Sequence, residues 1–328
     1  MKLAFFGGIY NNHIALKAAI ADAHQRGAER MFCLGDLGAF GPHPDRTCEL
    51  IREHEIEVVQ GNYDHSIGHG LNDCQCGYTD PRDNHFAQLS YDYTLANTSD
   101  DHRAWLRSLP TAIRFEVDGL RFLLCHGSPR RTNEFLWEST TSTQFLTKLC
   151  NDFECDVILG THTGLHWQRT WNRPAVVQAS SLQLSSEREA CTTPADTRRF
   201  INVGALGRPE NDGTTNVWYT LLRTGNDARA GRSPLPRECS PLSPRADVWG
   251  TDVEDETRSQ SERTTLRSRR ERATLDVEFI PLAYDHQKLA REMIAEHLPD
   301  EFIETILTGW WTTCLEVLPS KERRRGRW

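Results

Sequence analysis

FCLGDLGAFGP, residues 32–42, is an apolar run that breaks off into a glycine-rich loop. The apolar residues predict a buried strand, and Gly35-Asp36 then places a carboxylate at the carboxyl end of that strand. Open α/β sheets bind their ligands at this end of their strands, so Asp36 is the first candidate site residue. Taken alone, the same residue could instead cap the following helix.

The same pattern recurs at three more predicted strands, each of which runs into a residue that can hold a metal ion. They are Ile56–Gln60, which runs into Asn62, Phe122–Cys125, which runs into His126, and Val157–Gly160, which runs into His162. One Asp, one Asn and two His offer oxygen and nitrogen ligands suited to a divalent metal. We therefore predict that these four strand ends bring the four side chains together at a common point.

Composition limits the class of protein. The chain has 328 residues and a formal net charge of -8, with a pI near 5.9. This length can bury a large core, and the acidic balance argues against a dedicated nucleic-acid surface, though not against a small phosphorylated substrate. The ten cysteines lack pairwise spacing, the first apolar run is too short for a signal peptide, and no run approaches a membrane span. We expect a cytoplasmic protein without a membrane segment.

The first half of the chain alternates predicted strands and helices, which favours a parallel layer. A two-residue Asp-Gly turn further on predicts a hairpin, so antiparallel strands are expected as well. The sequence thus predicts an α/β fold with mixed sheets. The predicted elements are strands at Lys2–Phe6, 32–34, Ile56–Gln60, Ala112–Val117 and Leu120–Cys125, helices at Ile14–Arg26, Pro44–Glu53, Asp83–Asn97 and Ser99–Ser108, and a long loop at His65–Arg82.

The second half of the chain divides into three parts. Strands at 175–178, 200–203 and 216–222 complete a domain that we place at residues 1–222. Residues 223–272 are rich in Ser, Pro and charged residues and poor in large apolar ones, so we expect a disordered polar insertion. Residues 273–328 supply a strand at 273–281 and helices at 284–297 and 301–307, which we expect to complete the same domain.

Three polar residues near strand ends are candidates for substrate binding. Arg130 follows His126 closely and could bind a phosphate, with a solvated charge pair as an equal alternative. Asn12 lies in a glycine turn that could cradle a phosphate but lacks the spacing and lysine of a P-loop. Arg208 lies in a loop that we expect to return to the sheet ends. Cys74 and Cys76 are interpreted as ordinary loop cysteines, with a metal or redox role as the lesser alternative.

These motifs, taken in order, resemble those of the calcineurin-like metallophosphoesterases over the first two thirds of the chain. The compact prokaryotic phosphodiesterases are the branch that the chain is most similar to. The resemblance implies a four-layer β-sandwich flanked by helices, and an enzyme that hydrolyses phosphate mono- or diesters with divalent metal ions (Mn, Fe, Zn or Mg). The matching motifs are Gly35-Asp36, Gly61-Asn62-x-Asp64, His126-Gly127, His162-Thr163 and Asn202-Val203-Gly204.

The sequence departs from the family pattern at positions that would serve one of the two ions. The family's Asp-x-His after the first strand is replaced by Gly8 and Tyr10, and its Gly-His-Thr-His ends here in Gly164. Given three ligands exclusive to each ion and one shared, three random losses would empty one site in only about two of thirty-five ways. We expect that one metal position was given up or rebuilt while the other was kept. Nearby replacement ligands would be Asn11, Asn12, His13, His65 and His166.

We therefore expect a metal-dependent phosphoesterase that hydrolyses a small phosphate mono- or diester with one retained metal. The resemblance implies a proton-donating histidine at the position of Tyr63, whose ordinary pKa of about 10 makes it a poor donor. Asp64 is expected to orient a ligand histidine. The alternative is a non-catalytic relative that binds a metal or phosphate and acts as a sensor or partner protein.

Overall fold

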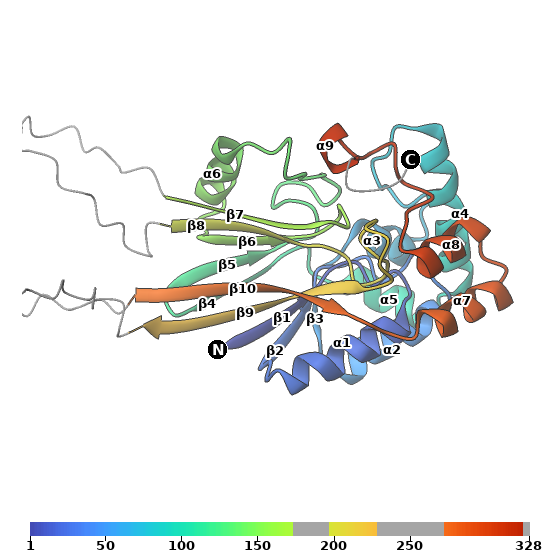
Figure 1. The fold of residues 1–328 in the computed structure, drawn as a ribbon, viewed down its shortest axis with the longest axis horizontal. Coiled ribbons are helices and arrows are strands. Elements are labelled where there is room, and N and C mark those ends of the chain that lie inside the picture. Colours follow the sequence, from blue (N-terminus) through green and yellow to red (C-terminus); the bar gives the residue numbers. More distant parts are fainter. Residues whose placement is uncertain (173–196, 228–271, 324–328) are drawn as a thin grey trace, which may run out of the picture.

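Two five-stranded sheets pack face to face in the computed structural model, which describes residues 1–172, 197–227 and 272–323 (Figure 1). The first sheet contains, in order across it, β10 (Arg272–Leu282), β9 (Val217–Asp227), β1 (Lys2–Phe6), β2 (Arg30–Cys33) and β3 (Glu57–Val58). The second contains β4 (Ile113–Val117), β5 (Leu120–Leu124), β6 (Val157–Gly160), β8 (Thr197–Val203) and β7 (His166–Asn172).

Both sheets mix parallel and antiparallel strands. In the first sheet β1, β2 and β3 are parallel, with Phe5 opposite Phe32, and β9 and β10 are antiparallel additions. In the second sheet β5, β6 and β8 are parallel, while β4 and β7 run antiparallel at the two edges. The predicted α/β class with mixed sheets is therefore confirmed.

Alternation of side chains along β1 explains why the sheet has two apolar faces. Leu3 and Phe5 belong to the core between the sheets, whereas Ala4 and Phe6 belong to the core beneath the helices. The Phe32 ring lies between those of Phe5 and Phe115, at centroid distances of 5.1 and 5.2 Å. Since Phe115 belongs to β4, this stack of rings joins the two sheets.

Helices cover both outer faces and one end of the sandwich (Figure 1). α1 and α2 lie on the first sheet and α6 lies on the second, which makes four layers as predicted. The remaining helices gather at the end to which β2, β5 and β6 point. The helices are α1 (His13–Gln25), α2 (Pro44–Glu53), α3 (Asn62–His69), α4 (Pro81–Asn97), α5 (Asp100–Ser108), α6 (Thr143–Asp152), α7 (His286–Ala295), α8 (Asp300–Thr308) and α9 (Ser320–Arg323).

The structure differs from the predicted elements in several places. α6 and β7 were not predicted, and α3 occupies the start of the stretch expected to be a long loop. β9 continues to Asp227 and β10 begins at Arg272, so both strands reach into the stretch expected to be a disordered insertion. The strand predicted at 175–178 and residues 228–271 of that insertion lie outside the described residues.

None of the helices in the described ranges has the length and apolar character needed to cross a bilayer.

Candidate functional site

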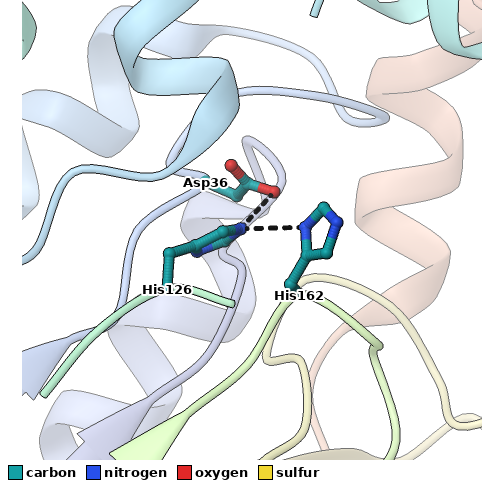
Figure 2. A group of neighbouring side chains, drawn as sticks. All are labelled: Asp36, His126 and His162. Atoms are coloured by element: carbon teal, nitrogen blue, oxygen red, sulfur yellow. Dashed lines mark hydrogen bonds and ion pairs between the residues drawn. The ribbon is translucent and has the colours of Figure 1, made fainter. Parts of the chain in front are cut away.

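Side chains from three strand ends meet at the helix-covered end of the sandwich (Figure 2). Asp36 follows β2, His126 follows β5 and His162 follows β6. His126 Nε2 lies 3.1 Å from Asp36 Oδ2 and 3.2 Å from His162 Nδ1. One ligand atom of each residue lies within 4.8 Å of the other two, and all three side chains are buried. Three of the four predicted ligands are therefore brought together.

The backbone fixes the orientation of His126. Its Nδ1 lies 2.6 Å from the carbonyl oxygen of Leu34, and because a carbonyl can only accept, Nδ1 must donate. Nε2 is then the atom that faces Asp36 and His162. A hydrogen bond of this kind behind a histidine is the usual support for a metal-binding imidazole.

Electrostatics within the group favour a cation. Burial opposes ionisation of Asp36, but the charge and hydrogen bond of His126 outweigh burial and lower the pKa of Asp36. Burial likewise opposes the charge of His126, yet Asp36 raises the pKa of this imidazole. Burial and the neighbouring His126 lower the pKa of His162 to about 3, so His162 is neutral. The carboxylate of Asp36 and the imidazole of His162 thus both face Nε2 of His126. A divalent ion can take the place of the proton on that nitrogen.

Two buried atoms close to the group have no hydrogen-bond partner among the described residues. They are His162 Nε2 and Asn62 Oδ1. The amide nitrogen of Asn62 donates to the carbonyl oxygen of Cys74 at 2.9 Å and contacts Cys76 Sγ at 3.5 Å, which leaves the amide oxygen unused. Buried polar atoms are rarely left unpaired, so these two fit a site that takes an additional ligand. The donor set suits a divalent metal.

The backbone is strained at two of these residues. Asp36 has φ of 55° and His162 has φ of 68°, both in the left-handed region that side chains other than Gly, Asn and Asp seldom adopt. Such conformations persist where the surrounding structure enforces them, and they concentrate at functional sites.

Asp64 holds the Asp36 loop in place and does not contact a histidine. Its carboxylate accepts the backbone N–H groups of Gly61, Asp36 and Leu37 at 2.8 to 2.9 Å. The prediction that Asp64 orients a ligand histidine is therefore wrong, because both of its oxygens serve the backbone of two loops. Its effect on the site is indirect and passes through the position of Asp36.

Tyr63 lies beside the group but its hydroxyl is already engaged. The backbone N–H of Tyr63 donates to Asp36 Oδ1 at 3.1 Å, and its phenol donates to the carbonyl oxygen of Ala87 at 3.2 Å. Burial raises the pKa of this phenol far above its ordinary value. Both facts weaken Tyr63 as a proton donor.

A cavity of about 50 Å³ opens onto this group. Its polar wall contains Asp36, His162 and Arg208, and half of the remaining lining residues are aromatic. Phe302 of α8 and Cys314 also line it, so the C-terminal segment closes a site whose ligands come from the first half of the chain. No motif in that segment of the sequence indicates a site, so its contribution was not predicted.

The other predicted site residues are engaged elsewhere. Asn12 is fully buried, caps α1 through Ala15 N at 2.9 Å and donates to the carbonyl oxygen of Gly207 at 3.0 Å, as expected of a structural residue. Arg130 is exposed and pairs with Glu134. Their substrate-binding roles stay predictions that these contacts do not support.

The suggested replacement ligands also stay outside the group formed by the described residues. His13 pairs with Glu292 and His166 with Glu210, the Asn11 amide bonds Gly41, and His65 stacks on His69. Cys74 and Cys76, interpreted as ordinary loop cysteines, are joined in a disulfide. Cys76 lines the cavity.

The profile of the calcineurin-like phosphoesterase superfamily domain matches residues 1–226. An uncharacterized protein of Methanocaldococcus jannaschii is 24% identical over 220 residues, which are 67% of this chain and 82% of that protein.

Two solved structures are similar to almost the whole chain. One is a metallophosphoesterase from Sphaerobacter thermophilus, with 20% identity and a TM-score of 0.55 over 94% of this chain and 99% of that one. The other is a hypothetical protein from Pyrococcus horikoshii OT3, with 17% identity and a TM-score of 0.60 over 95% of this chain and 99% of that one. At these identities the likeness shows a shared fold.

Proposed function

This chain belongs to the calcineurin-like phosphoesterase superfamily, and on that premise we propose that it is a metal-dependent phosphoesterase. The substrate class is a small phosphate mono- or diester. The cofactor is one divalent ion, drawn from Mn, Fe, Zn and Mg. The proposed ligands are Asp36, Asn62, His126 and His162.

One observation carries this proposal. Ligand atoms of Asp36, His126 and His162 lie within 4.8 Å of one another in a buried setting, next to two buried polar atoms without partners. A purely structural cluster would satisfy these atoms internally, because an unpaired buried polar atom costs about 1–3 kcal/mol. An open coordination position facing a cavity is typical of catalytic rather than structural metal sites.

The chain's own residues would hold the metal ligands in place, bind the phosphoryl group and limit the access of water. A divalent ion, when bound, supplies a Lewis acid for a phosphoryl oxygen and for an attacking water. The Leu34 carbonyl holds the ring of His126, and the amide of Tyr63 holds one oxygen of Asp36. Arg208 borders the same cavity and can donate to phosphoryl oxygens. The aromatic wall limits access of bulk water.

Proton donation to the leaving group is the weak step. The Tyr63 phenol already donates to the carbonyl of Ala87, and burial raises its pKa. Efficient donors have a pKa near the working pH, which Tyr63 lacks. We therefore expect substrates whose leaving group departs without protonation, such as aryl esters.

A second candidate function is a non-catalytic relative that binds metal or phosphate. The engaged hydroxyl of Tyr63 and the small cavity favour it. Such a protein would keep the metal and the anion without turnover, and would serve as a sensor or a partner protein.

The domain organisation follows the same proposal. Residues 1–222 and 273–328 act as one catalytic domain, with 223–272 as an insertion in it. β10 pairs with β9 along its whole length, and Phe302 and Cys314 line the cavity, which supports a single domain. The same pairing places residues 223–227 and 272 in the sheet rather than in the insertion.

Metal content together with turnover of an aryl phosphate diester tests the proposal. Asp36→Asn is suited to this purpose because Asn tolerates the left-handed backbone. The matched control is Asp118→Asn, the same chemical change at a left-handed Asp in the hairpin turn between β4 and β5.

We expect about one metal ion per chain and measurable turnover in the wild type and in the Asp118 variant, and loss of both in the Asp36 variant. Metal without turnover in the wild type would favour the binding protein. Unchanged metal content in the Asp36 variant would contradict the site assignment.

A further inference from the structure

Arg208 is a buried cation without a counter-ion in the described part of the chain. The residue is 8% exposed, and its guanidinium makes no hydrogen bond or ion pair with any described residue. Its buried Nε has no acceptor among the described residues. Buried charges are almost always paired, because removing a charge from water costs several kcal/mol (order of magnitude). The unpaired guanidinium therefore points to a missing anion.

Aromatic rings hold this guanidinium without using its donors. Its central carbon lies 3.6 Å from the ring centroid of Trp311, and the rings of Tyr10 and Phe40 are at 5.9 and 6.0 Å. Trp311 is itself fixed, since its Nε1 donates to the carbonyl oxygen of Pro209 at 2.6 Å. Stacking orients a planar guanidinium and leaves its N–H groups in the ring plane free for an oxyanion.

Arg208 lines the same cavity as Asp36 and His162. A volume of about 50 Å³ has room for a few water-sized atoms, at about 10–15 Å³ each. This is enough for the oxygens of a phosphoryl group but not for an organic leaving group, which must extend through the open side. Arg208 and the Asp36 group thus face the same small polar space.

Arg208 and the rings around it lie next to Gly8 and Gly164, two of the positions where this sequence departs from the family pattern. A Cβ built on Gly8 would lie 2.4 Å from the ring of Tyr10. A Cβ built on Gly164 would lie 3.2 Å from Trp311 and 3.6 Å from Nη2 of Arg208. The rings and the guanidinium occupy the volume that longer side chains at Gly8 and Gly164 would need.

We propose that Arg208 serves as the second cation of the site and binds the phosphoryl oxygens across the cavity from a single metal ion. This inference rests on the proposed function for the role of the metal, whereas oxyanion binding by Arg208 stands without it. The ligand class is a tetrahedral oxyanion at the end of a phosphate ester. Binding would pair the guanidinium and satisfy donors that otherwise stay unsatisfied.

Titration calorimetry with inorganic phosphate, on chelator-treated and on metal-loaded full-length protein, tests this role. The variants are Arg208→Gln, which removes the charge, and Arg208→Lys, which keeps it without the planar fork. The control is Arg52→Gln, since Arg52 also stacks on a tryptophan, Trp105 at 5.8 Å, but pairs with Asp101 at the surface.

We expect the chelator-treated wild type and the Arg52 variant to bind phosphate equally well. Arg208→Gln should weaken phosphate binding about tenfold or more, with Arg208→Lys between the two. Metal content should stay at about one ion per chain in every variant. Near-ultraviolet circular dichroism shows whether the packing of the aromatic side chains survives in each variant. If Arg208→Gln alters this packing, the comparison of Arg208→Lys with the wild type decides the test.

The outcomes separate this inference from the proposed function. If Arg208→Gln binds phosphate like the wild type, or if the wild type holds two ions per chain, Arg208 is not the second cation even if turnover is present. If the wild type shows no turnover and no metal but loses phosphate binding with Arg208→Gln, the phosphoesterase proposal fails and oxyanion binding by Arg208 stands.

Discussion

Tyr10 fills the space next to Gly8, and this packing can be tested by a double-mutant cycle. A methyl group at Gly8 would lie 2.4 and 2.5 Å from two carbons of the Tyr10 ring, far inside van der Waals contact. The ring cannot retreat easily, because Gly207 packs against its Cβ and the residue is buried. Gly8→Ala should therefore overpack this region.

The expected magnitudes follow from this contact. Overpacking a filled site lowers the free energy of unfolding by about 1–3 kcal/mol. Replacing Gly by Ala at a compatible backbone position raises it by about 0.4–1 kcal/mol. Gly8→Ala alone should therefore destabilise the protein. Tyr10→Ala should cost about 3–5 kcal/mol through lost burial. In the Tyr10→Ala background the clash is absent, so Gly8→Ala should be neutral or slightly stabilising. The coupling energy is about 1–3 kcal/mol.

Urea unfolding of the wild type, the two single variants and the double variant measures this coupling. Residue 10 has a left-handed backbone, with φ of 51° in the wild type, and any strain there is common to the proteins with and without the Gly8 change, so it cancels in the cycle. A cost for Gly8→Ala that is the same with and without the Tyr10 ring would refute the reasoning. It would mean that the ring does not occupy the space next to Gly8.

Further predictions concern the metal, the phenol and pH. Chelator treatment should lower the thermal midpoint, since a ligand at a hundred times its Kd adds about 2.7 kcal/mol, and an unchanged midpoint would argue against a bound metal. Tyr63→Phe should cost about 1 kcal/mol by removing the bond to Ala87 while turnover of an aryl diester persists; a large loss of turnover would restore Tyr63 as the donor. Asp156→Asn should destabilise the folded protein at neutral pH. Burial opposes ionisation of Asp156, but its hydrogen bonds to Arg121 outweigh burial and lower the pKa of this carboxyl below 3.8. That stabilisation is present above about pH 4 and is lost as pH falls through the lower folded pKa, so urea midpoints of wild type and variant should converge in acid.

The sequence could predict the retained half of the site because strand ends are local features. An apolar run followed by Gly35-Asp36, or one that runs into His126 or His162, marks the end of a buried strand. Within each sheet, parallel strands carry these ends to the same side, and the packing of the two sheets then brings the end of β2 beside the ends of β5 and β6. The order of elements predicted an α/β fold with mixed sheets, and the family resemblance implied its four layers.

Other features depended on contacts between distant residues. α3 is short and polar at its start, and its N-terminus is held by Asp64 rather than by an apolar pattern, so the stretch was taken for a loop. Phe302 and Cys314 reach the cavity only because the C-terminal segment folds back over it. No spacing in the sequence indicates that Arg208 lacks a partner, since this is a property of everything that surrounds it.

A guanidinium in place of a metal ion changes what the site can do. Unlike a metal ion, a guanidinium is covalently part of the chain, so the positive charge that Arg208 would contribute does not depend on the supply of metal. A guanidinium is not a Lewis acid, however, and it cannot lower the pKa of a water or bind an alkoxide directly. It can hold phosphoryl oxygens and offset their charge. If both proposals hold, a metal held by Asp36 and its neighbours would activate the water, and Arg208 would bind and orient the phosphate.

Without a second ion at the leaving oxygen, and with Tyr63 bonded to Ala87, the rate should then fall steeply as the leaving group becomes more basic. A series of aryl phosphate diesters of increasing leaving-group pKa measures that slope, and a flat profile would mean that some other group in the cavity protonates the departing oxygen.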